Sequence, residues 1–241
     1  MDWLTVATYN IHQCVGVDKR HDPDRVIQVI LELDAQVIGL QEVNSGGSPG
    51  TLTKGEEYLS EATGYTAIPG PTMLREDSRY GNSLFSRFPV ADVKHIDLSI
   101  PGREPRGAID ALLDIGSHSV HVLVAHFGLR RAERRYQVRR LAELILKEKS
   151  WLTIVLADTN EWLPMSGSLR PLENCLGRSP RLRTYPAPYP ILALDRIWLR
   201  PELGLSRIHV YNTPLARVAS DHLPVKAYTK LDQPISERSL R

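Results

Sequence analysis

The sequence predicts a single α/β domain, and three observations indicate that class. The chain opens with an apolar strand-like stretch, an amphipathic helical stretch and a second apolar stretch, an order typical of α/β folds. Short strand-like segments bounded by turn residues follow between residues 82 and 126. The 241 residues contain no internal repeat, low-complexity tract or linker that would divide them, and α/β folds of this length often close as one domain.

The first forty residues supply the opening strand, helix and strand. A strand is expected at residues 4–9 and a helix at 23–33, with Asp22 as its N-cap and Pro23 as its first residue. Apolar residues recur at helical spacing along that helix. The stretch at 36–40 is short and β-branched, so it is expected to form a buried strand rather than another helix.

The middle of the chain changes from loop to strands. Residues 46–71 are rich in Gly, Ser and Thr, so we expect a loop-dominated surface insertion with one short helix at 56–63 that ends at Gly64. The segment that follows predicts a meander of four short strands, at 83–86, 90–98, 108–115 and 120–125.

The last hundred residues return to alternating helix and strand. A long helix is expected at 132–149, and a Pro-rich stretch occupies 184–190. Four strands are predicted in this part, at 153–157, 195–199, 205–211 and 223–228. From about residue 230 the chain is a polar tail, expected to fray.

Composition excludes several classes of protein. Hydrophobic residues make up 42% of the chain and charged residues 24%, which are ordinary globular values and exclude disordered and fibrous proteins. No apolar run of 18 residues and no basic-then-apolar leader occurs, so neither a membrane span nor a secretory signal is expected. The two cysteines, Cys14 and Cys175, lack metal-type spacing and are too few for a disulfide framework. A cytoplasmic location is therefore expected.

Charge is nearly balanced over the whole chain and uneven along it. The net charge is only +2, unlike that of a strongly basic duplex-binding protein, so any anion binding must be local. Residues 101–140 hold eight arginines against four acidic residues. Arginine outnumbers lysine 23 to 7, which suits bidentate recognition of phosphate, although genome composition produces the same bias.

Polar side chains stand at the ends of the predicted strands, where a sheet edge can hold several of them in one cleft. Five of them follow strands: Asn10, Glu42, His126, Asp158 and Asn160. Two groups precede strands instead, namely Asp195 and the Ser220-Asp221-His222 stretch. If the last strands run antiparallel to the earlier ones, all of these groups meet at one edge.

The residue types in this set favour hydrolysis with a hard divalent cation. Carboxylates are oxygen ligands suited to Mg²⁺ or Mn²⁺ rather than to copper or structural zinc. A carboxylate beside a histidine fixes the tautomer of the imidazole and raises its basicity. Ser220 is poorly placed to be the nucleophile for its neighbour His222, so water is the favoured nucleophile. A serine or zinc hydrolase lacks support, because no nucleophile elbow or paired-histidine spacing occurs.

Seven short stretches resemble, in order, the motifs of the endonuclease/exonuclease/phosphatase superfamily, to which deoxyribonuclease I belongs, and the ending after the Pro-rich loop is similar to that of small bacterial members. The resemblance covers residues 4–228 and implies a four-layered α/β sandwich, two mixed β-sheets packed face to face with helices outside. It also implies cleavage of phosphate esters with a divalent cation. The stretches are Thr8-Tyr9-Asn10-Ile11-His12, Leu40-Gln41-Glu42-Val43, Tyr80-Gly81-Asn82-Ser83-Leu84, Ala125-His126-Phe127, Ala157-Asp158-Thr159-Asn160, Leu194-Asp195-Arg196-Ile197 and Ser220-Asp221-His222-Leu223-Pro224.

The resemblance assigns a metal group and a water-handling group. It implies that Glu42 is the principal metal ligand, that Asn10 supports the site and that Asp221 lies near the metal. Asp158 and Asn160 would orient or activate the water, and Asn160 would also touch the phosphate. The usual Gly-Asp-Phe-Asn stretch keeps both of these polar positions here and changes only the flanking residues.

The resemblance also assigns the histidines. It implies that Asp195 pairs with His222, and that His222 and His126 contact the scissile phosphate as charge builds in the transition state. Some nuclease members carry a carboxylate at the position of His12, so a second acidic ligand is in doubt in this chain.

Substrate contacts are expected from a strand mouth and from the long helix. Asn82 and Arg106 resemble family positions near the substrate. Arg131, Arg134 and Arg135 prolong the apolar stripe of the helix towards His126, so we expect them to bind phosphate or an anionic leaving group. Glu–Arg pairs buried beneath the helix are the competing interpretation.

The reaction class is better defined than the substrate. A metal-dependent phosphodiesterase or nuclease is the first expectation, and a phospholipid or small-molecule phosphodiesterase or phosphatase is the alternative. Nucleic acid and phospholipid head groups are the candidate substrates. The Pro-rich loop, with Tyr185 and Tyr189, could supply exposed apolar residues for a phospholipid head group. A catalytically silent phosphate-binding scaffold is the alternative from another class.

Overall fold

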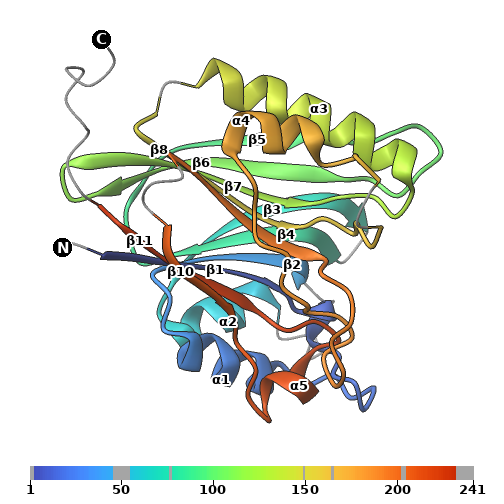
Figure 1. Cartoon of the computed structure of the whole chain (residues 1–241). Coiled ribbons are helices and arrows are strands. Elements are labelled where there is room, and N and C mark those ends of the chain that lie inside the picture. The colour runs from blue at the N-terminus through green and yellow to red at the C-terminus, as the bar shows by residue number, and fades with distance from the viewer. Residues whose placement is uncertain are drawn as a thin grey trace.

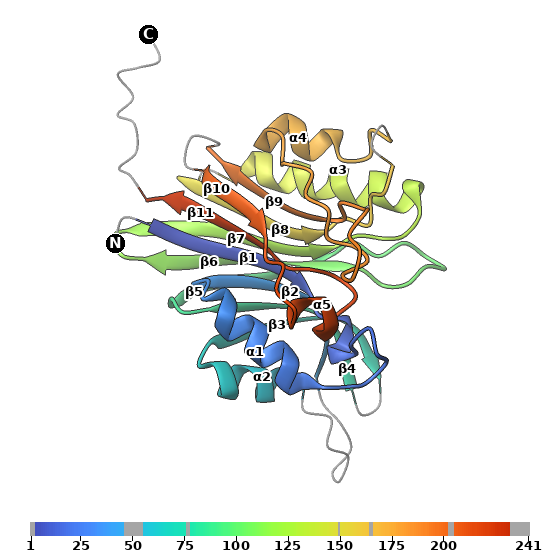
Figure 2. The same ribbon diagram turned by 60° about the horizontal axis from the view of Figure 1, so that its bottom comes forward.

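The computed structural model describes residues 3–45, 55–75, 78–148, 150–163, 166–201 and 205–231. Two β-sheets pack face to face, and helices cover both outer faces, so the chain has four layers (Figures 1 and 2). This arrangement confirms the predicted α/β sandwich. The predicted tail from about 230 lies almost wholly outside the described residues.

The first sheet has six strands in the order β10-β11-β1-β2-β4-β3. The parallel pair β1–β2 lies at its centre, flanked by antiparallel neighbours. The strands are β1 (Trp3–Asn10), β2 (Val37–Ser45), β3 (Thr66–Arg75), β4 (Ser78–Ser86), β10 (Leu205–Val210) and β11 (Val225–Lys230).

Two predictions for this sheet need correction. Residues 66–71, expected as loop, belong to β3, an edge strand where Pro69 and Pro71 are tolerated because one side of the strand has no partner. The strand predicted at 83–86 was expected in the meander, but β4 pairs with β2 and β3 instead. Strand periodicity indicates a strand without naming its partner.

The second sheet has five strands in the order β5-β6-β7-β8-β9. The first three form the antiparallel part of the predicted meander, and β8 runs parallel to β7 after a helical crossover. The strands are β5 (Val90–Asp97), β6 (Gly107–Ile115), β7 (His118–His126), β8 (Leu152–Asp158) and β9 (Asp195–Arg200).

Helices cover each sheet on its outer side (Figure 1). The first sheet is covered by α1 (Pro23–Leu33), α2 (Glu56–Thr63) and α5 (Ala216–Ala219), and the second by α3 (Arg131–Lys147) and α4 (Arg170–Leu176). A 3-10 turn at His12–Cys14 follows β1. As predicted, Asp22 caps α1, accepting a hydrogen bond from the Arg25 backbone N–H at 3.2 Å. The sequence did not predict α4 and α5, which are too short for a clear periodic pattern.

Apolar side chains fill the three spaces between the layers. The central core joins inward-facing residues of both sheets, including Val6 and Val124, while separate clusters lie beneath α1 and α3. At Gly39 the sheets approach so closely that an added Cβ would lie 2.8 Å from the Leu156 Cβ. Both sheets are therefore held rigidly at one distance. No helix within the described ranges is long and apolar enough to span a membrane.

Candidate active site

Three polar residues form one row across the second sheet. In the strand register His126 of β7 pairs with Asp158 of β8, which pairs with Asp195 of β9. All three side chains are at least 95% buried. Because β9 runs antiparallel to β8, its first residue meets the last residues of β7 and β8. The edge expected from the sequence therefore exists.

Asn10 connects this row to the first sheet. Its Nδ2 donates to Glu42 Oε1 at 3.0 Å and to Asp158 Oδ2 at 2.9 Å. Asn10 ends β1 and Glu42 lies in β2, at an irregularity in the pairing of β2 with β4. Such irregularities redirect side chains. One amide thus holds a carboxylate from each sheet beside the other.

Two residues of the cluster adopt left-handed backbone conformations. Glu42 has φ of 57° and Asn160 has φ of 49°. Non-glycine residues in this region carry a conformational cost and persist only where the surroundings fix them. Both are residues to which the motifs assign a role, so the strain coincides with the candidate site.

His222 is held as an imidazolium. Its Nδ1 donates to Asp195 Oδ2 at 2.9 Å, and its Nε2 lies 3.8 Å from Asp158 Oδ2. Burial acts to lower the pKa of His222, but the carboxylates of Asp195 and Asp158 outweigh it and raise that pKa to about 10. The Tyr185 ring lies over the imidazole, with centroids 4.9 Å apart. His222 therefore presents a positive Nε2–H to the cluster.

His126 is held neutral, in contrast. Its Nδ1 lies 3.0 Å from Arg106 Nη1, which can only donate, so Nδ1 accepts from the guanidinium. Burial, together with the Arg106 charge, lowers the pKa of His126 to about 3. Glu104 in turn accepts from Arg106 Nη2 at 3.0 Å. The two histidines thus enter the site in opposite charge states.

Asp158 is kept ionised between them. Its Oδ1 accepts from the Asn160 backbone N–H at 2.9 Å, and its Oδ2 accepts from Asn10. Burial acts to raise the pKa of Asp158, but the charged imidazole of His222 and these hydrogen bonds outweigh it and lower that pKa. The Asn160 side chain donates to the Phe127 carbonyl at 2.9 Å and lies 3.0 Å from His126 Nε2.

Glu42 lies in an excess of negative charge. Burial raises the pKa of Glu42, and the carboxylates of Asp158 and Asp221 raise it further. Asp221 is only half-buried, with Oδ1 3.8 Å from His12 Nδ1. The Glu42 carboxylate thus lies in the field of two others, and carboxylate oxygens are the ligands that a hard divalent cation takes. The residues present therefore fit Mg²⁺ or Mn²⁺.

A second set of three potential ligands is less suited to an ion. One atom each of Asp158, Asp195 and His222 lie within 4.8 Å of one another. A histidine ligand must be neutral, and the carboxylates of Asp195 and Asp158 raise the pKa of His222, which favours its charged form. The carboxylates around Glu42 are the better candidates for the same reason.

Three further residues adjoin the cluster that we did not assign from the sequence. Tyr80, on β4, lies in the field of both Glu42 and Arg106, and burial raises the pKa of its hydroxyl. The Tyr185 ring packs against His222 in a tilted arrangement, and His12 faces Asp221. Tyr80 and His12 occur inside the quoted motifs, so the motifs could have indicated them, while Tyr185 was expected only as an apolar residue of the Pro-rich loop.

The predicted substrate-binding residues lie in different parts of the structure. Arg106 reaches the cluster through His126. Asn82 is 4% exposed, and its amide donates to the Gly107 carbonyl at 2.9 Å, beside Arg106. It therefore holds the strand mouth in place, and its contact with substrate remains a prediction.

The helix arginines also separate. Arg134 is 1% exposed and forms a two-point pair with Glu161, at 3.2 and 3.3 Å. Its Nη1 donates to the Gly128 and Leu129 carbonyls. The prediction that Arg134 binds substrate was wrong, because its guanidinium is held in a buried ion pair with Glu161. Such a buried Glu–Arg pair was the competing interpretation. Arg131 and Arg135 instead line a pocket between α3 and α4.

The chain is similar to known proteins over most of its length. A model described as "Endonuclease/Exonuclease/phosphatase family" matches residues 7–222. The uncharacterized protein YbhP of Escherichia coli (strain K12) is 26% identical, over 92% of this chain and 94% of that protein.

Two solved structures share the fold. The endonuclease/exonuclease/phosphatase from Beutenbergia cavernae aligns with a TM-score of 0.77 and 20% identity, over 97% of this chain and 73% of that one. The human Nocturnin catalytic domain with bound sulfate anion aligns with a TM-score of 0.70 and 20% identity, over 95% and 96% of the two chains. At these identities the structures show the fold alone.

Proposed function

Because the chain belongs to the endonuclease/exonuclease/phosphatase family, whose members are phosphoesterases, we propose that it is a divalent-metal-dependent phosphodiesterase or nuclease. The observation that carries the proposal is the pair of histidines in opposite charge states on either side of the ionised Asp158. A scaffold that only binds phosphate has no need for a buried carboxylate held ready to accept a proton.

Glu42 and Asp221 would hold the cation, with Asn10 fixing the Glu42 carboxylate. When bound, Mg²⁺ or Mn²⁺ supplies positive charge that draws the phosphate to an otherwise acidic edge and stabilises the charge of the transition state. These carboxylates favour a hard cation of this kind, and the family is generally dependent on one.

Asp158 is the residue suited to activate water. A water that attacks phosphorus gives up one proton, and the new P–O bond forms as the bond to the leaving group breaks. Asp158 is ionised and fixed by Asn10 and Asn160, so it can take that proton. Its hydrogen bonds leave the carboxylate little freedom to turn away.

The histidines and Arg106 are suited to bind the phosphate oxygens. His222 directs a charged Nε2–H into the site, and Asp195 holds the ring by its other nitrogen. His126 lies on the opposite side as a neutral imidazole, with Arg106 bonded to its Nδ1. Fixed donors of this kind stabilise charge as it develops without reorganising. The negative charge of the pentavalent transition state is their target.

A phospholipid or small-molecule phosphodiesterase or phosphatase is the second candidate. Large apolar side chains are exposed on the two loops that follow Asn160 and Tyr185, namely Trp162, Leu163, Tyr189 and Ile191. Apolar rims favour substrates with an apolar part.

Both cysteines are free thiols, in keeping with the cytoplasmic location that we propose.

Hydrolysis of a substrate panel tests the proposal. The panel comprises bis-p-nitrophenyl phosphate, p-nitrophenyl phosphate, nicked and single-stranded DNA, RNA and a phospholipid, each with Mg²⁺, Mn²⁺ or chelator. We expect metal-dependent cleavage of a diester that Glu42→Ala abolishes while the circular dichroism spectrum is unchanged. Full activity of that variant would remove Glu42 from the metal site. Absence of turnover on every substrate would instead favour the binding scaffold.

A further inference from the structure

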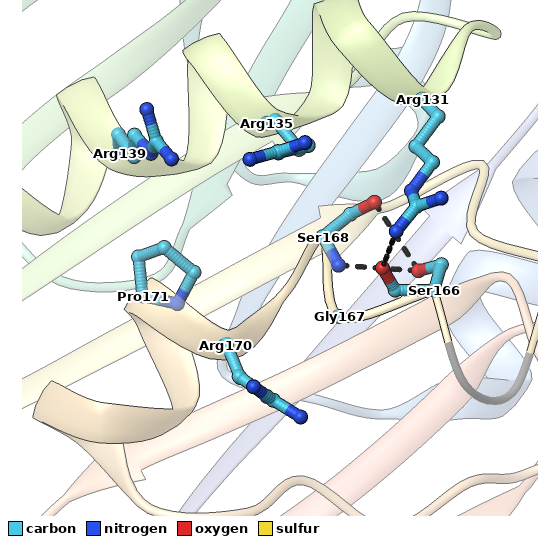
Figure 3. Close-up of a pocket in the computed structure, with 8 residues that line it drawn as sticks. All are labelled: Arg131, Arg135, Arg139, Ser166, Gly167, Ser168, Arg170 and Pro171. Atoms are coloured by element: carbon cyan, nitrogen blue, oxygen red, sulfur yellow. Dashed lines mark hydrogen bonds between the residues drawn. The ribbon is translucent and has the colours of Figure 1, made fainter.

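An arginine-lined pocket lies between α3 and α4, on the outer layer of the sandwich (Figure 3). Its volume is about 390 Å³, and its wall contains no acidic side chain among the residues that the structure describes. A cavity of this size holds roughly a dozen water molecules at about 30 Å³ each. The residues that line it are Arg131, Arg135, Arg139, Ser166, Gly167, Ser168, Arg170 and Pro171.

Three of the four arginines form a row along α3. Arg131, Arg135 and Arg139 are four residues apart, so they share one face of the helix and rise by about 6 Å from one to the next. Like charges at this spacing destabilise an isolated helix. No ion pair involves Arg131, Arg135 or Arg139 within the described part of the chain, so the row carries an uncompensated positive charge.

The opposite wall is built by a fixed turn. Arg131 Nη2 donates to the Ser166 carbonyl at 2.7 Å, and the Ser166 and Ser168 hydroxyls lie 3.2 Å apart. Gly167 has φ of +67°, a conformation that favours glycine. Arg170, at the start of α4, adds the fourth guanidinium to this wall. Hydrogen bonds within the protein therefore fix this wall of the pocket.

We propose that this pocket binds an oligophosphate, an anion with two or more linked phosphate groups. Guanidinium groups pair with phosphate through two parallel hydrogen bonds, and four of them spread over the cavity match more than one phosphate. The wall offers Pro171 as its one apolar side chain and no aromatic ring for a base, as far as the structure describes it. The recognised part is thus the phosphate chain itself.

The pocket is distinct from the catalytic cluster. None of its lining residues belongs to the row of His126, Asp158 and Asp195. Between the two lies Glu161, which follows Asn160 and accepts from both Arg134 and Ser166. Binding in the pocket therefore does not rest on the proposed hydrolysis and can be measured without it.

Calorimetric titration of the full chain tests the proposal. Phosphate, pyrophosphate and tripolyphosphate are titrated in the presence of a chelator, which removes divalent cations from the catalytic cluster. The variants are Arg135→Glu, Arg139→Glu and the milder Arg139→Gln. Arg140→Glu is the matched control, because Arg140 is the next residue of the same helix and does not line the pocket. Glu42→Ala reports on the catalytic cluster.

We expect tripolyphosphate to bind more tightly than phosphate. Arg135→Glu and Arg139→Glu should each weaken the binding of tripolyphosphate by about ten-fold or more. Arg140→Glu and Glu42→Ala should change it by less than about two-fold, since neither residue contributes a hydrogen bond there. If Arg139→Glu and Arg140→Glu weakened anion binding equally, general charge attraction would account for the binding, and the pocket would not be a specific site. Loss with Glu42→Ala alone would place the anion at the catalytic cluster. Failure of all three anions to bind would overturn the proposal.

Discussion

The strand-end cluster that we propose to be catalytic and the arginine pocket that we propose to bind oligophosphate are built in opposite ways. The edge gathers carboxylates and histidines that are buried and hydrogen-bonded to one another. The pocket gathers exposed arginines without carboxylate partners in its wall, so far as the structure describes it. An acidic edge attracts phosphate only with a cation in place, whereas the pocket attracts it directly. Chemistry requires fixed, mutually compensated groups, and anion capture requires only unbalanced charge.

The largest effect is expected at the carboxylate between the two histidines. Asp158→Asn keeps the side-chain shape but cannot take the proton of water, so kcat should fall by about 10⁴-fold. Steady-state kinetics on the best substrate of the panel measures it. Oligophosphate binding in the pocket should be unchanged. A decrease in kcat of less than about ten-fold would remove Asp158 from proton transfer.

The ion pair that separates the two regions should matter for stability. Arg134→Ala leaves Glu161 buried without its partner, and the free energy of unfolding should fall by about 3–5 kcal/mol. Arg135→Ala, at the exposed neighbouring position, should change it by less than about 0.5 kcal/mol. Urea denaturation of both variants makes the comparison. Equal stability of the two would contradict the structural role of Arg134.

The charged histidine should act on the transition state. His222→Ala should lower kcat by about 10²–10³-fold and leave KM nearly unchanged, because its Nε2–H is aimed at developing charge. His95→Ala, an exposed histidine bonded to the Pro69 carbonyl, is the control and should retain full activity. If KM alone rose in His222→Ala, the residue would be a ground-state binder.

The smallest effect is expected from the pocket on catalysis. Arg131→Ala combined with Arg135→Ala should raise KM for polyanionic substrates by a few-fold, since a distant charge steers rather than positions. KM for bis-p-nitrophenyl phosphate, which carries one phosphate, should change less. Kinetics at low and high salt separate the two cases. A large fall in kcat would place these arginines at the reacting centre instead.

Much of the fold could be predicted because its signals are local. The α1 cap at Asp22 and the apolar stripe of α3 each depend on residues a few positions apart in one helix, and both occur as expected. The prolines of β3 obscured a strand, because their meaning depends on the strand lying at an edge. The placement of β4 in the first sheet depends on pairing with distant residues, which periodicity does not encode.

The sequence by itself determined which residues would stand at the strand ends, and hence the types of group available: carboxylates, amides and two histidines. Only the tertiary structure decided their charge states. His126 and His222 are the same type of residue, each next to a strand end, but one lies against Arg106 and the other against Asp195. Arg134 and Arg135 are adjacent in the chain, yet one is buried in an ion pair and the other lines the pocket. A residue's type is local, whereas its protonation and its partners depend on groups that only folding brings near.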